Sequence, residues 1–194
     1  MNWREHTKNL GQRLESSLRA VLAWLDEPDA LLDFRSDPTV WTVREISEHV
    51  ALTNRYLLIL IEKIAARSRT RRDRGDAPPP VPSRIDHLED LAARDFRWSH
   101  PEHMTPRGEH DSAAVRAELE QQLATTTALL AELPDGEGAL HRIRMSVVGG
   151  SDGDDRLDLY QFLAIIALHA ERHVRQMERS RLARSGSQMK ANES

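Results

Sequence analysis

The chain has 194 residues, no cysteine and a formal net charge of -4. This length fits one domain with a substantial core, and the lack of cysteine excludes disulfides, thiolate metal sites and a cysteine nucleophile. The charge gives no overall basic field for nucleic acid, and no apolar run approaches the roughly 20 residues of a membrane span. The N-terminus is too polar for a secretory signal. We therefore expect a cytoplasmic protein that binds neither nucleic acid nor a membrane.

The first half of the chain predicts two long amphipathic helices. Apolar residues recur at the helical period over residues 3–25. The second helix begins at Thr42, which forms a potential capping box with Glu45, and continues to about residue 66. Residues 67–74 are rich in arginine and are followed by three prolines at 78–80. We expect this polar stretch to be a solvated loop, because prolines and charge repulsion oppose a continuous helix.

The second half predicts a short helix over residues 83–93 and two more long helices. The third long helix starts near Asp111 or Ser112 and ends before Pro134. A glycine-rich segment at residues 149–153 is typical of turns. The fourth long helix opens at Asp158, a good N-cap with Gln161 three residues later, and extends to about residue 183. No convincing strand is predicted, and residues 185–194 are expected to be a disordered tail after a domain of residues 1–184.

Four amphipathic helices of similar length predict an all-α fold, a four-helix bundle. The two long connections allow crossover topology in place of simple up-and-down hairpins. Sites inside such a bundle take their ligands from facing helices.

The most informative residues are three histidines on apolar helix faces. His169 and His173 are four residues apart, so they share a face, and that face carries the apolar residues Phe162, Ile166 and Met177. His49 lies on a similar stripe of the second helix. A buried imidazole needs a partner or a metal. His49, His169 and His173 could therefore converge into a three-histidine site for a divalent transition metal, with the remaining coordination positions open to water or substrate.

Other interpretations of these residues remain open. Inward histidines can be ordinary core residues that bond one another or the backbone. Glu45 and Gln176 could orient ligands, but Glu45 can equally be the capping residue and Gln176 a solvated side chain. The arrangement typical of zinc proteases is absent, because Ala170 follows His169, and Glu171 lies on another side of the helix from His173.

Three segments together resemble the DinB/YfiT-like superfamily. They are Trp41-Thr-Val-Arg-Glu-Ile-Ser-Glu-His49, Thr105-Pro-Arg-Gly-Glu109 and His169-Ala-Glu-Arg-His173. The resemblance implies a four-helix bundle, often dimeric, that holds a divalent metal through His49, His169 and His173. Zinc or nickel is the first expectation, with iron, manganese or cobalt as further candidates.

The same resemblance implies two kinds of chemistry on a small-molecule substrate. Some members of the superfamily transfer a low-molecular-weight thiol such as bacillithiol, mycothiol or glutathione, and others are described as metal-dependent hydrolases. We expect a metal-dependent thiol S-transferase or hydrolase, and by analogy a homodimer. The alternative is a metal-binding stress or interaction protein without catalysis.

Two polar segments have open roles. The arginines of residues 67–74 could bind a phosphate, although such a run is usually only solvated, and its lack of aromatic residues argues against single-stranded nucleic acid. The loop histidines His100, His103 and His110, with Trp98, could form part of a substrate wall, but we favour ordinary surface positions.

Overall fold

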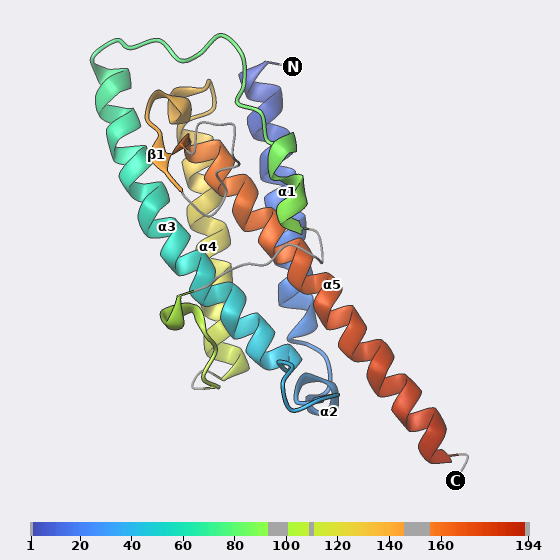
Figure 1. Ribbon diagram of the computed structural model, residues 1–194. Coiled ribbons are helices and arrows are strands. Elements are labelled where there is room, and N and C mark those ends of the chain that lie inside the picture. The colour runs from blue at the N-terminus through green and yellow to red at the C-terminus, as the bar shows by residue number, and fades with distance from the viewer. Residues whose placement is uncertain (1, 93–100, 109–110, 146–155, 193–194) are drawn as a thin grey trace.

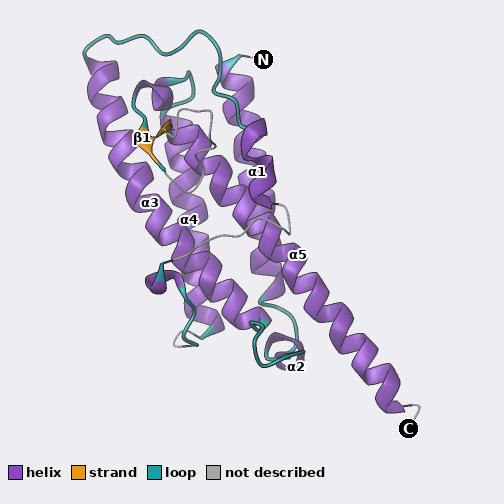
Figure 2. Cartoon of the chain, viewed as in Figure 1, coloured by secondary structure: helices purple, strands orange, loops and turns teal. Residues whose placement is uncertain are grey.

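The computed structural model describes residues 2–92, 101–108, 111–145 and 156–192. Helices make up most of this part of the chain, and a single short hairpin accounts for its strands (Figures 1 and 2). The elements in chain order are α1 (Trp3–Trp24), α2 (Asp29–Leu32), α3 (Val43–Asp73), η1 (Asp86–Ala92), η2 (Glu102–Met104), α4 (Ser112–Glu132), η3 (Glu137–Leu140), β1 (Ile143–Arg144), β2 (Arg156–Leu157) and α5 (Leu159–Asn192). The expected all-α fold is confirmed.

Side-chain caps fix the starts of the long helices close to where the sequence predicts them. Asn2 accepts a hydrogen bond from the third residue of α1, and Asp111 does the same for α4. At α3 the capping box of Thr42 and Glu45 is complete, because each side chain bonds the other residue's backbone N–H. Each cap satisfies backbone donors that the first helical turn cannot pair internally.

The four long helices form a closed ring in the order α1, α4, α3, α5, each in contact with two neighbours. Helices α3 and α4 run in the same direction, since Arg55 pairs with Glu118 and Arg69 pairs with Glu132 further along both helices. The connection from α3 to α4 must therefore return along the length of the ring, as Figure 1 shows. The end of α4 and the start of α5 lie together, since the Tyr160 hydroxyl donates to the carbonyl oxygen of Leu133, so the connection between these two helices needs no crossover.

The prediction of a loop at residues 67–74 is wrong, because α3 continues to Asp73. Arginine has a high helix propensity, and basic residues are favourable near a helix C-terminus. One side of this turn is also packed, since Ser68 is fully buried and its hydroxyl lies 3.5 Å from the carbonyl oxygen of Gly138. On the outer face of α3, Arg69 donates two hydrogen bonds to Glu132 and so ties this turn to α4.

Smaller differences from the sequence prediction concern the remaining segments. The expected short helix at residues 83–93 is a 3-10 helix over Asp86–Ala92. Antiparallel pairing of β1 with β2 supplies strands that the sequence did not predict. Helix α5 continues to Asn192, so the expected disordered tail is helical through that residue. The glycine-rich segment at 149–153 lies outside the described residues.

The core lies between the helices and includes every apolar residue of the stripe expected on the C-terminal helix. Phe162, Ile166 and Met177 are fully buried, and His169 and His173 are nearly so. Among the described residues, no helix combines the length and the apolar character that crossing a membrane requires.

Candidate metal centre

The three histidines singled out in the sequence meet in the interior. His49 comes from the second turn of α3, and His169 and His173 come from the middle of α5, the helix packed beside it. One ring nitrogen of each residue lies within 4.8 Å of the others, and all three residues are buried. The Nε2 atoms of His169 and His173 are 3.1 Å apart. The expected convergence of the three rings is confirmed.

Two of the rings have a fixed outward partner. Nδ1 of His49 lies 2.7 Å from the carbonyl oxygen of Met104. Since a carbonyl only accepts hydrogen bonds, this nitrogen carries the proton and Nε2 of His49 keeps its lone pair. Nδ1 of His173 lies 2.9 Å from Oε1 of Gln176 in the same way. Both rings are therefore in the tautomer in which Nε2 carries the lone pair that a metal would bind.

The spacing of the rings fits a shared metal ion. With a metal–nitrogen bond of about 2.1 Å, two bound imidazoles have ring centroids about 4.5 Å apart at a right angle and about 5.2 Å apart at the tetrahedral angle. The observed separations are 4.4 Å for His169 and His173, 4.9 Å for His49 and His173, and 5.1 Å for His49 and His169. Neutral imidazoles of this geometry suit zinc, nickel, copper or iron. The cluster is thus compatible with metal binding.

The chain's similarity to known proteins agrees with this cluster. A family model described as the DinB superfamily matches residues 10–177. The chain belongs to the DinB superfamily. All three histidines lie inside the matched region. Comparisons with curated proteins and with solved structures gave no match.

In this DinB-superfamily chain a segment of the α3–α4 connection closes one side of the cluster. Met104, which ends η2, supplies the carbonyl oxygen beside His49. Four residues later the backbone N–H of Gly108 donates to the buried carboxylate of Glu48 at 2.9 Å. Adjacent residues of α3 therefore hold this segment at two points. No residue pattern indicates the Met104 contact, because every residue has a main-chain carbonyl.

Of the two residues considered as ligand-orienting partners, the structure places only Gln176 at the cluster. Glu45 is the capping residue of α3 and also accepts two hydrogen bonds from Arg35. Burial opposes ionisation of Glu45, but the hydrogen bonds from Thr42 and the pairing with Arg35 hold its pKa below the usual value. Its carboxylate is thus committed away from the histidines.

The remaining sequence candidates that the structure describes lie outside the cluster. Glu171 forms a two-point ion pair with Arg13 on α1, in keeping with its expected position on another side of α5. His103 is exposed and its ring lies 5.2 Å from that of Tyr56, as expected for a surface position. Trp98, His100 and His110 lie outside the described residues. Trp41 instead covers the cluster, with its ring centroid 4.8 Å from that of His49.

Proposed function

We propose that His49, His169 and His173 bind a divalent metal, zinc or nickel first, and that the protein is a metal-dependent transferase for a low-molecular-weight thiol. The convergence of one ring nitrogen from each of the three histidines within 4.8 Å carries this proposal. Three neutral ligands leave the metal's full charge and at least one coordination position for a substrate, which is the difference between a catalytic site and a closed structural one.

The carboxylates around the cluster favour thiol transfer over hydrolysis. Two acidic residues close to the histidines along α3 and α5, Glu45 and Glu171, are each paired with an arginine, Arg35 and Arg13 respectively. Activating water generally calls for a base within hydrogen-bond reach. A thiol that coordinates a metal loses its proton without a separate base. This chain has no cysteine, so the thiol must be a diffusible cofactor.

The protein's own residues would orient and enclose the reactants. Met104 and Gln176 hold two imidazole rings in the coordinating tautomer. Trp41 and the segment around Met104 shield the cluster on the side of α3, which excludes water and strengthens electrostatic interactions inside. A small electrophile would be the second substrate. The non-catalytic metal-binding protein remains the competing proposal.

Turnover assays test this function. Protein purified without a nickel column and loaded with zinc or nickel would be mixed with bacillithiol, mycothiol or glutathione and with monochlorobimane as the electrophile. We expect fluorescent conjugate to form with at least one thiol, and to fall to background in His169→Ala. Arg4→Gln, which removes an exposed ion pair with Asp135, is the control and should keep the activity. A metal-loaded protein that turns over no thiol but cleaves esters would favour the hydrolase. One that does neither would favour the metal-binding protein.

A further inference from the structure

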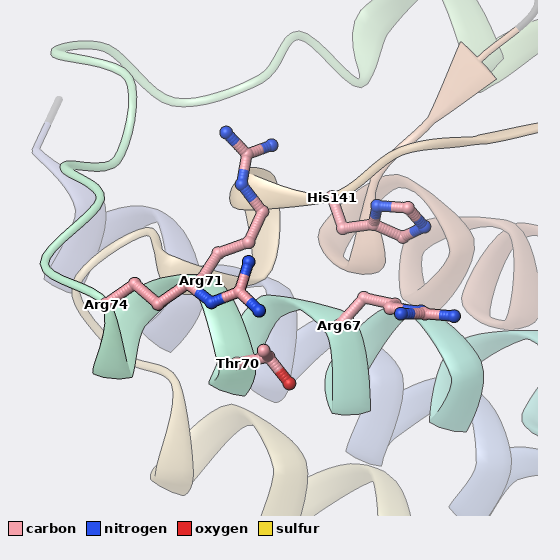
Figure 3. A pocket seen from close by; sticks show the side chains of 5 residues that line it. All are labelled: Arg67, Thr70, Arg71, Arg74 and His141. Carbon is pink, nitrogen blue, oxygen red and sulfur yellow. The ribbon is translucent and has the colours of Figure 1, made fainter.

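We propose that the C-terminal end of α3 and the segment after η3 form a second site that binds the phosphate group of a small molecule. The residues that line this cleft are Arg67, Thr70, Arg71, Arg74 and His141 (Figure 3). Arg67 is about 27 Å along α3 from His49, given 1.5 Å per helical residue. The site therefore shares no residue with the histidine cluster, and the inference does not depend on the proposed catalytic function.

The helix itself brings the basic residues together. Positions 67, 70, 71 and 74 recur at three and four residues, so they share one face of α3. This alignment exists only because the arginine-rich run is helical, which the sequence did not predict. Figure 3 shows His141 opposite Arg67, and the Arg74 side chain folded back toward Thr70.

Arg71 holds the segment after η3, which forms the wall of the cleft opposite α3, in place. Its guanidinium donates to the carbonyl oxygen of Leu140 and pairs with the carboxylate of Asp76 at 2.6 Å. These contacts fix both the wall and the guanidinium before any ligand arrives. A site organised in advance loses less conformational entropy on binding.

The charge of the cleft is incompletely neutralised. Within the described part of the chain, neither Arg67 nor Arg74 has a carboxylate within ion-pair distance, and Asp76 offsets only Arg71. The neighbouring arginines on the other side of the helix differ: Arg69 pairs with Glu132, and Arg72 pairs with Asp73. Among the arginines of this turn, the two without an ion pair in the described part of the chain, Arg67 and Arg74, are thus both on the face that lines the cleft.

The donor set matches a phosphate group better than a carboxylate. Guanidinium groups bind phosphate oxygens with two parallel hydrogen bonds, and a hydroxyl such as that of Thr70 adds a neutral donor. A carboxylate has two oxygens and satisfies one such fork, whereas a terminal phosphate has enough oxygens for several. Burial and the guanidinium groups of Arg67 and Arg71 lower the pKa of His141, so its ring can supply one further N–H in the neutral form.

The shape of the cleft favours a small molecule. Its volume is about 470 Å³, within the range typical of small-ligand pockets. A nucleic-acid surface would instead need a longer basic track, and the five lining residues include no phenylalanine, tyrosine or tryptophan on which successive bases could stack.

Calorimetric titration with inorganic pyrophosphate tests the site. At constant ionic strength we expect pyrophosphate to bind at least tenfold more tightly than acetate. The Arg67→Gln/Arg74→Gln variant should weaken pyrophosphate binding at least tenfold. Arg69→Gln/Arg72→Gln removes the same charge from the other side of α3 and should change the affinity less than threefold. Arg74→Gln alone, at an exposed helix end, should weaken binding by severalfold and provides a second test if the double variant does not fold.

Three outcomes would overturn the site. The first is equal weakening in both double variants, which would mean that only net charge matters. The second is loss of pyrophosphate binding in His169→Ala, which would place the anion at the metal centre; we expect that variant to bind normally. The third is tighter binding of a single-stranded DNA oligomer than of pyrophosphate, which would identify a nucleic-acid surface.

Discussion

The main-chain carbonyl oxygen of Met104 lies 2.7 Å from Nδ1 of His49, across a sequence separation of 55 residues. This contact joins the crossover connection to the candidate metal centre. It also determines which nitrogen of His49 is available to coordinate, because the proton must sit on the nitrogen that faces the carbonyl. The connection is therefore part of the site as well as a link between helices.

Gln176 plays the corresponding role for His173, and its removal should weaken metal binding. We expect Gln176→Ala to raise the dissociation constant for zinc about 10- to 100-fold, as is typical when a ligand-orienting partner is lost, while the helical circular dichroism signal stays unchanged. Competition with a chromogenic chelator measures the constant. Gln176→Glu keeps an acceptor and should retain most of the affinity. The exposed Gln121 is the matched control, and an effect of Gln121→Ala as large as that of Gln176→Ala would contradict this role.

Two glycines with positive φ should respond differently to alanine. Gly136 has φ 97° and Gly75 has φ 87°, so a Cβ is strained at both, by about 1 kcal/mol. At Gly136 the added Cβ would also lie 2.4 Å from the Trp3 ring, whereas Gly75 has open space. Overpacking of this kind typically lowers the free energy of unfolding by about 1–3 kcal/mol more. Urea unfolding should show Gly136→Ala losing clearly more stability than Gly75→Ala, and equal losses would contradict the packing around Trp3.

His6 should make stability depend on pH. It is buried beside Trp3 and Tyr160, its Nε2 has no hydrogen-bond partner among the described residues, and burial lowers its pKa from the ordinary 6.5. The unfolded chain then binds a proton more readily than the folded one. The contribution of neutral His6 is complete above pH 6.5 and is lost as the pH falls through the lowered folded-state pKa.

The comparison of the wild-type protein with His6→Leu isolates this effect. Between pH 7.5 and 5.5 the wild type should lose up to about 1.4 kcal/mol more stability in total than the variant does, nearly all of it below pH 6.5. Urea unfolding at the two pH values measures the difference, which cancels contributions from the other histidines. Parallel losses in the two proteins would show that His6 is not held neutral.

The sequence predicted those features that depend on local patterns. The helical period and the caps at Thr42 and Asp111 located the long helices, and the spacing of His169 and His173 indicated a shared inward face. The helical state of residues 67–73 was missed although the helix propensity of arginine favours it, and contacts with Glu132 and Gly138, which lie far along the chain, support it further.

Contacts between distant segments also account for what the sequence missed at the two sites. The Met104 carbonyl could not be found from residue types, since every residue has one. The basic cleft required two facts that only the structure supplies: that α3 extends past Ala66, and that His141 returns to the same end of the helix. Composition alone indicated charge there, but not its arrangement.

The central claim is that three imidazoles hold one metal ion, and the metal content of the purified protein tests it most directly. Elemental analysis of protein prepared without a nickel column should find close to one divalent metal ion per chain, and His169→Ala should lose most of it while keeping the helical circular dichroism signal. Metal-free wild-type protein that takes up no zinc or nickel, or a His169→Ala variant with unchanged metal content, would contradict the account.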